Sequence, residues 1–257
     1  MTDSSPDFDS TSNTDGIDAW SDTASIIPGP SLSHPPLDIN ILKTYYTTFI
    51  GLSNALGARQ ALPPELALYI CQLAGFEQWG TKHAPEGYDI YAHDSEVQSI
   101  TWFQFGPFTK RTRNLVKSVQ LVTMSKHQGW VSDRGAGSWS WFELQLARPT
   151  NEDSDIDRAE VKLRANQDKA SWRSHSHPVD RETAAQQGRF AEHRGTVFDS
   201  DHELWEEVKE GDVLQVVAKA RFGGWANTAS DGMLIIGTWW EPSVEMMDLL
   251  RNGHTNT

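Results

Sequence analysis

Apolar positions change their spacing along the chain, from three or four residues in the first third to two in the remainder. Between residues 39 and 50 apolar side chains recur every three or four positions, which predicts an amphipathic helix. A second helix is predicted to begin at Pro63-Pro64-Glu65 and to end at Gly75. Proline suits the first turn because its missing N–H would be unpaired there, and glutamate suits the positive helix end. One side of this helix carries Leu66, Tyr69, Ile70 and Leu73.

From about residue 97 the spacing becomes two. Residues 119–123, 140–146 and 212–222 alternate between apolar and polar, and residues 233–240 read as a strand buried on both faces. Glycine-rich turns separate these segments, which is typical of antiparallel sheets. No strand–helix–strand alternation is present, which argues against a parallel α/β enzyme. The pattern predicts a mainly β protein: an antiparallel, jelly-roll-like β-sandwich over about residues 95–242.

Composition divides the rest of the chain. Residues 1–36 are rich in Ser, Thr, Asp and Pro, so they bury too little apolar surface to fold and are predicted to be a disordered acidic tail. Residues 37–80 form the helical segment. Residues 149–195 show little alternation and are predicted to be a polar insertion in the sandwich, and residues 243–257 a C-terminal tail.

Charge and cysteine content limit the function classes. The formal net charge is −13, and seven acids but no Lys or Arg precede Lys43. This balance argues against a nucleic-acid partner, whose phosphates need cations. The single cysteine, Cys71, excludes an internal disulfide. The start lacks the pattern of a signal peptide, and no apolar run approaches a membrane span, so we expect a cytoplasmic or nuclear protein without a membrane partner.

Catalytic motifs are absent from the sequence. It lacks the glycine patterns that bind phosphates, a Gly-x-Ser-x-Gly elbow and a His-Glu-x-x-His helix. We therefore predict no catalytic residue, no cofactor and no metal. His175 and His177 could share a strand face and bind a metal with His193 or His202, but a solvated loop is the alternative. A hydrolase that uses a carboxylate or histidine of the end loops is a further alternative.

Two sets of residues are candidates for ligand binding. The first combines aromatic and polar side chains near glycine turns, which suits a sugar or a peptide, although tryptophans of a sandwich also fill cores. Its members are His127, Trp130, Trp139, Trp141, Arg221, Trp225, Asn227 and Asp231. The second is a basic patch in a stretch without acids, which could bind an anionic ligand, a phosphopeptide or the acidic tail, or could be a soluble strand face. Its members are Lys110, Arg111, Arg113, Lys117 and Lys126.

The segment Leu62-Pro63-Pro64-Glu65-Leu66, with Ile70 and Leu73 after it, resembles the opening of an F-box. That family uses a Leu-Pro-x-Glu-Leu turn and helix to dock on the adaptor of cullin-type ubiquitin ligases. The match covers about fifteen residues, whereas a complete F-box continues for two further helices. The resemblance implies a docking helix made of Leu62, Pro63, Pro64, Glu65, Leu66, Tyr69, Ile70 and Leu73.

The C-terminal half also carries a resemblance. Its segments 127–130, 139–143 and 220–225 are similar to β-sandwich domains that follow such openings in fungal proteins of undefined function, and more loosely to jelly-roll substrate domains attached to F-boxes, some of which bind glycans. Our leading hypothesis is therefore a non-catalytic binding protein, a substrate-recognition component of a cullin-type ubiquitin ligase. The alternative is a stand-alone lectin-like sandwich that binds a carbohydrate or peptide.

Overall fold

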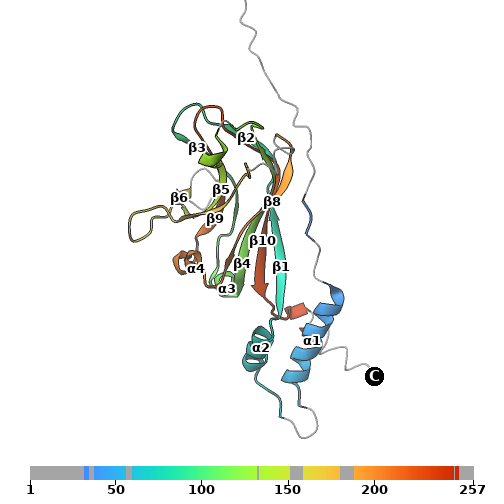
Figure 1. Cartoon of the computed structure of the whole chain (residues 1–257). Coiled ribbons are helices and arrows are strands. Elements are labelled where there is room, and N and C mark those ends of the chain that lie inside the picture. The colour runs from blue at the N-terminus through green and yellow to red at the C-terminus, as the bar shows by residue number, and fades with distance from the viewer. Residues whose placement is uncertain are drawn as a thin grey trace, which may run out of the picture.

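Two five-stranded antiparallel sheets form the main body of the described chain (Figure 1). The computed structural model describes residues 32–34, 38–55, 60–131, 133–150, 159–179, 188–245 and 247–248. The first sheet contains β1 (Glu77–His83), β2 (Tyr88–Tyr91), β4 (Val116–His127), β8 (Ala191–Asp199) and β10 (Ala226–Trp239). The second sheet contains β3 (Val97–Phe105), β5 (Ser140–Pro149), β6 (Ala159–Val161), β7 (Ser171–Ser176) and β9 (Val213–Arg221).

The strand order is that of a jelly roll. In the first sheet the strands pair as β1-β10-β4-β8, with β2 on the same side of β10 as β1; in the second they pair as β3-β9-β5-β6, with β7 beside β6 on β5. Successive strands pass from one sheet to the other, apart from the β1–β2 and β5–β6–β7 steps. The last strand, β10, lies between the first strands and β4. This arrangement of two interleaved Greek keys defines a jelly roll, as the sequence predicts.

The core lies between the sheets and follows the period of two. Phe142, Leu144 and Leu146 of β5 face Leu121 of β4 and Leu234 of β10, and all five are fully buried. Trp102 also enters this core, where its indole nitrogen donates to the carbonyl of Glu86 (2.7 Å). The alternation predicted along β5 is confirmed, and the structure decides between its faces: the even-numbered apolar residues face the core, and Trp141 faces outward.

The sandwich is longer than its sequence pattern indicates. It begins at Glu77 rather than near residue 95. The sequence pattern misses β1, whose side chains are mostly exposed, and β2, which has only four residues. The range 149–195 is not an insertion, since it contains β6, β7 and the start of β8. These strands present polar residues such as Ser174 to the interior, which hides them from a search for apolar alternation.

Helices α1 (Ile39–Ser53) and α2 (Pro64–Leu73) lie together beyond one end of the sandwich (Figure 1). Asp38 caps α1, because its carboxylate accepts from the N–H of Asn40 (2.8 Å). At the end of α2, Gly75 has a φ of +74°. The N–H groups of Gly75 and Phe76 donate to the carbonyls of Gln72 and Cys71 (2.9 Å each), which is a Schellman motif and confirms the predicted helix end.

Trp240, directly after β10, joins the helices to the sandwich. Its buried ring lies 5.0 Å from the ring of Tyr46 and 6.0 Å from that of Phe49, both on α1, and 6.1 Å from Phe76. The start of the predicted C-terminal tail also packs here, since the N–H of Ser243 donates to the Tyr46 hydroxyl (3.0 Å). The remainder of that tail, from residue 249, lies outside the described residues. Two short helices, α3 (Lys110–Leu115) and α4 (Glu203–Glu207), and a 3-10 turn (Arg134–Ala136) complete the described elements.

Leu32 covers the outer face of the first sheet. It is 6% exposed and packs with Val122 of β4 and with Met233 and Ile235 of β10. Its N–H donates to the carboxylate of Asp231 (2.7 Å), which lies beside an irregularity in the pairing of β10 with β4. The contact explains why β10 is apolar on both faces. It also corrects the predicted tail boundary, because Leu32 is packed on the sheet; residues 1–31 and 35–36 lie outside the described residues.

Candidate functional site

The predicted docking helix presents its apolar stripe to solvent. Leu66, Tyr69, Ile70 and Leu73 are 52%, 57%, 39% and 72% exposed. The opposite side of α2 holds it in place: Ala67 and Cys71 are fully buried in a cluster with Phe49 and Trp240. Burial of Cys71 raises the pKa of its thiol, which keeps it protonated and unreactive. Four exposed apolar side chains on ten residues of helix are unusual for a surface that contacts only water.

The aromatic ligand candidates separate into exposed and buried groups. Trp130 is 55% exposed and lies over Gly224, where an added Cβ would come within 3.0 Å of its ring. Gly224 has a φ of +91°, so both its conformation and the ring require glycine. Trp139 is half-buried and meets Phe222 edge-on at 4.6 Å. The guanidinium of Arg221 lies 4.8 Å from the Phe222 ring. These side chains form the aromatic end of the jelly roll: Trp130, Trp139, Arg221 and Phe222.

The buried candidates are structural. His127, Trp141, Trp225 and Asn227 are all at most 7% exposed. The amide of Asn227 donates to the backbone carbonyls of Trp141 (3.0 Å) and Lys219 (3.2 Å), so it ties the two sheets together. Trp141 lies on the outer face of the second sheet beneath Arg173, whose guanidinium is 4.8 Å from its ring. These four side chains are therefore not available to a ligand.

Glu143 holds a polar cluster on that outer face. It accepts from the indole of Trp141 (2.6 Å), the ammonium of Lys219 (2.6 Å) and the hydroxyl of Ser171 (2.5 Å). Burial raises the pKa of its carboxyl, but these hydrogen bonds outweigh that effect and lower the pKa. Asp231 is also engaged, by Leu32, and lies on the outer face of the other sheet. The structure thus does not bring Asp231 to the aromatic end.

The predicted basic patch is divided. Lys110, Arg111 and Arg113 lie on α3, and Lys117 follows at the start of β4, where it pairs with Glu77. Arg111 pairs with Glu241 (2.9 Å). Lys126 is near the opposite end of β4, a separation of about 30 Å for nine strand residues, with its ammonium 4.7 Å from the Phe190 ring. The five cations therefore form no single surface, and an anion could contact at most the three on α3.

The structure reveals a buried histidine cluster that sequence reasoning named only in part. A continuous chain of hydrogen bonds runs across the interior, with heavy-atom distances from 2.7 to 3.1 Å. In order, it joins Ser140, His177, Ser125, Thr123, His175 and Ser174. The rings of His127 and His193 lie 6.0 Å and 5.2 Å from that of His177. We call His127, His175, His177 and His193 the histidine cluster.

The environment favours the neutral form of all four rings. Burial, followed by the positive charge of His193, lowers the pKa of His127 and lowers that of His175 to about 3. The same causes, with further repulsion from His175 and His127, place the pKa of His177 well below its ordinary value. Burial also lowers the pKa of His193, although a hydrogen bond to the backbone of Ser125 partly opposes this. At neutral pH the cluster is therefore uncharged.

The histidine cluster lacks the features of a metal or catalytic centre. Across the described ranges, no group of three or more His, Cys, Asp or Glu side chains is arranged to hold a metal ion. His202, the fourth histidine considered for such a site, instead accepts from the N–H of Leu204 at the start of α4 (3.1 Å). Ser125 and Ser140, which contact His177, are fully buried and out of reach of a substrate. Among the described residues, no carboxylate is hydrogen-bonded to the four rings.

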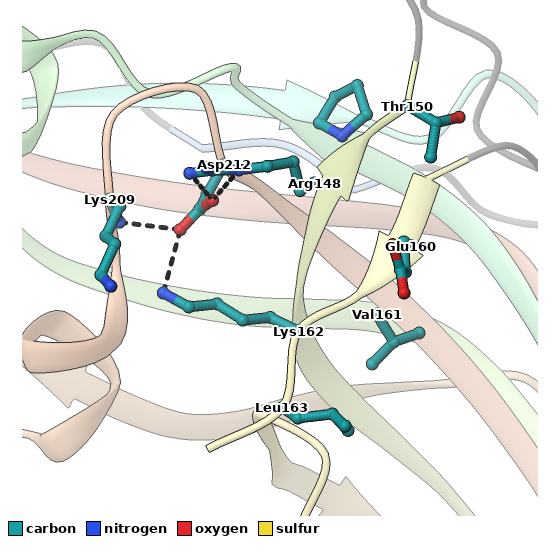
Figure 2. Close-up of a pocket in the computed structure, with 9 residues that line it drawn as sticks. Arg148, Thr150, Glu160, Val161, Lys162, Leu163, Lys209 and Asp212 are labelled. Atoms are coloured by element: carbon teal, nitrogen blue, oxygen red, sulfur yellow. Dashed lines mark hydrogen bonds and ion pairs between the residues drawn. The ribbon is translucent and has the colours of Figure 1, made fainter. Parts of the chain in front are cut away.

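A cavity of about 480 Å³ lies between the end of β5, β6 and the loop before β9. Figure 2 shows Arg148 and Lys162 directed at the carboxylate of Asp212. Arg148 donates to one oxygen at 2.6 and 3.0 Å, and Lys162 and the backbone N–H of Lys209 donate to the other at 3.2 and 2.8 Å. The Asp212 side chain is 1% exposed. Arg148 and Lys162 therefore neutralise a buried carboxylate. Their bonds to it link β5, the residue after β6 and the loop before β9.

Comparisons with known proteins supply no family. No known family profile and no curated protein matches the chain. Two solved structures of infectious bursal disease virus align weakly. The Gt strain structure is 8% identical over 62% of this chain and 33% of that one, with a TM-score of 0.33; the Gx strain structure is 9% identical over 62% and 32%, with a TM-score of 0.30. The chain thus spans about a third of their length. None of the described helices is long and apolar enough to span a membrane.

Proposed function

We propose that the protein is a non-catalytic receptor in which α2 docks on a ubiquitin-ligase adaptor and the jelly roll recognises a further ligand. One observation carries this proposal: α2 exposes Leu66, Tyr69, Ile70 and Leu73 on one side while its other side is fixed against α1 and Trp240. An apolar helix face of this kind suits a groove on a protein partner. The class of partner rests on the resemblance of residues 62–66 to an F-box opening.

The geometry fits a receptor with two ends. The helices lie beyond one end of the sandwich, and β2 and β3 extend toward the other (Figure 1). Trp240 fixes the helices through contacts with Tyr46, Phe49 and Phe76. A partner bound to α2 would therefore leave the far end of the jelly roll open. Such a separation allows an adaptor and a ligand to bind at the same time.

The docking surface is tested by Leu66→Asp/Ile70→Asp. Both side chains are exposed, so the fold should persist, whereas two carboxylates on an apolar contact should lower the affinity for the adaptor by at least about a hundredfold. The measurement is binding of a purified ligase adaptor to the immobilised full chain, with a pull-down from fungal lysate read by mass spectrometry in parallel. Far-UV circular dichroism checks that the variant is folded.

Thr44→Asp/Thr47→Asp is the matched control. It adds the same charge to exposed positions of the neighbouring helix α1 and should bind the adaptor as the wild type does. The docking proposal is wrong if the wild type fails to bind the adaptor, or if the Leu66→Asp/Ile70→Asp variant binds it equally well. A general effect of negative charge would instead weaken both variants.

A second candidate function is favoured by the aromatic end. Trp130 is exposed at a glycine turn, and Trp139, Phe222 and Arg221 are close to one another on adjoining segments. Flat apolar rings beside a guanidinium suit a carbohydrate or an extended peptide. In this case the jelly roll would act as a stand-alone lectin-like module, and α2 would not be needed.

Glycan and peptide arrays with the full chain test this alternative. Trp130→Ala should weaken any binding at the aromatic end by about fivefold or more, because stacking on an exposed tryptophan contributes on the order of 1 kcal/mol or more. Trp79→Ala is the matched control, since Trp79 is also exposed but lies on β1. Equal loss in both variants, or binding that Trp130→Ala leaves unchanged, would place the ligand elsewhere.

A further inference from the structure

The histidine cluster lies where the two sheets meet along one side. β7 is at the edge of the second sheet and β8 at the edge of the first, and each pairs with one neighbour among the described strands. The hydroxyl of Thr196 on β8 donates to the carbonyl of Ser174 on β7 (3.1 Å). An added Cβ at Gly195 would lie 1.9 Å from the Ser174 hydroxyl, so only glycine allows this approach. We call this contact between β7 and β8 the seam.

The cluster spans the seam from both sheets. His175 and His177 come from β7 and the residue after it, His193 from β8 and His127 from β4. Hydrogen bonds from the rings of His175 and His177 to Thr123 and to Ser125 cross from one sheet to the other. The ring of His175 also stacks on Phe142 at 4.7 Å, within the core. These contacts depend on neutral rings, because a positive charge on one ring would repel a positive charge on its neighbours.

No described opposite charge faces the cluster to accept added protons. Ionisable groups on the surrounding strands have other partners: Glu192 pairs with Arg194, Arg173 lies over Trp141, Lys126 lies over Phe190, Lys219 pairs with Glu143, and the Tyr88 hydroxyl donates to Asn227. A proton taken up by the cluster would therefore remain uncompensated. This situation makes the neutral cluster stabilising and the charged cluster destabilising.

We propose that the histidine cluster makes the seam an acid-sensitive latch, which holds β7 and β8 together while its rings are neutral and opens this side of the jelly roll when they are protonated. His193 is the first ring to take a proton. It is partly exposed, and its bond to the Ser125 carbonyl favours the charged form. Its charge then repels the other three rings.

The direction of the pH effect follows from linkage. A histidine whose folded pKa is depressed stabilises the fold fully above its unfolded pKa of about 6.5, and this stabilisation is lost as the pH falls below that value. For His175, with a pKa of about 3, the loss continues across the whole acidic range. Between about pH 7.5 and about pH 5, protonation of His175 alone would raise the open population about thirtyfold. Opening should be local, since edge strands open at lower cost than the whole fold.

Hydrogen–deuterium exchange of the full chain at these two pH values tests the latch, with labelling times scaled for the pH dependence of intrinsic exchange. We expect residues 171–177 and 191–199 to exchange at least about thirtyfold faster at the lower pH, while β1 and β10 change little. His175→Gln/His193→Gln should remain protected at the higher pH, and its acid response should be smaller than that of the wild type by the factor of about thirty that His175 contributes, because His127 and His177 can still respond. His93→Gln, an exposed histidine outside the cluster, should respond as the wild type does.

Three results would overturn the proposal. The first is no acid-dependent gain of exchange in β7 and β8 of the wild type. The second is an equal gain in β1 and β10, which would mean global unfolding instead of opening at the seam. The third is a wild-type acid response in His175→Gln/His193→Gln. The first two use the wild type alone, so they decide the question even if the variant does not fold.

Discussion

Replacement of Asp212 by Asn is expected to lower the free energy of unfolding by about 3 kcal/mol. The carboxylate is 1% exposed and neutralises Arg148 and Lys162. Its loss leaves Lys162, whose side chain is only 16% exposed, with the more distant carboxylate of Glu207 (4.0 Å) as its opposite charge. Asn also cannot accept on both sides as the carboxylate does, which weakens its bonds to Arg148 and to the N–H of Lys209. Denaturation by urea, monitored by tryptophan fluorescence, measures this change.

Glu160→Gln is the matched control for Asp212. Glu160 lines the same cavity from β6, and it is exposed, so the free energy of unfolding should change by no more than about 0.5 kcal/mol. A loss of less than about 1 kcal/mol in Asp212→Asn would contradict the structural role given to this buried carboxylate. It would show that water or a rearranged side chain neutralises the two cations equally well.

Trp240→Ala is expected to cost about 4 kcal/mol and to release α1 and α2 from the sandwich. The ring is 1% exposed and contacts Tyr45, Tyr46, Phe49 and Phe76, so its removal leaves a cavity at the centre of an aromatic cluster. Thermal denaturation measures the stability. Limited proteolysis measures the release, because cleavage within residues 39–75 should become faster before the sandwich is cut.

The adjacent Trp239→Ala provides a control of equal size. Trp239 is half-buried at the end of β10, where the ammonium of Lys117 lies 4.8 Å from its ring. Its removal should cost about 1 kcal/mol and leave the helices protected. If both variants lose the same stability and show the same cleavage, Trp240 has no special part in holding the helices. The proposed receptor would then lack a fixed connection between its helices and its jelly roll.

The parts of the fold that the sequence predicts are those with a regular apolar period. The second helix and its end at Gly75, the alternation along β5 and β9, and the buried β10 all follow from spacing and local capping. β7 escapes prediction because, apart from Trp172, its interior side chains are a hydroxyl and an imidazole. Their burial is favourable only through hydrogen bonds to β4 and β5, which depend on long-range pairing that spacing does not reveal.

The candidate site was predictable to a similar extent. The spacing of His175 and His177 places both on one strand face, and His193 is a reasonable third member, but nothing local indicates that Thr123 and Ser125 would occupy the ring nitrogens. The apolar stripe of α2 follows from its sequence, whereas its exposure and the burial of Trp225 and Asn227 do not. A tryptophan after two glycines suits a loop tip and a core equally, and only the pairing of β10 with β2 and β4 decides between them.

The position of Leu32 has a consequence for how the protein matures on the ribosome. Its contact with Asp231 joins residues 199 positions apart, and its binding surface is shared by β4 and β10. The N-terminal segment is synthesised first, yet its site is complete only when β10, the last strand, has emerged and paired. β1 also pairs with β10, so it stays unpaired until that strand has been synthesised. The early part of the chain therefore stays without its partners through most of translation, and chaperones have their longest access to it.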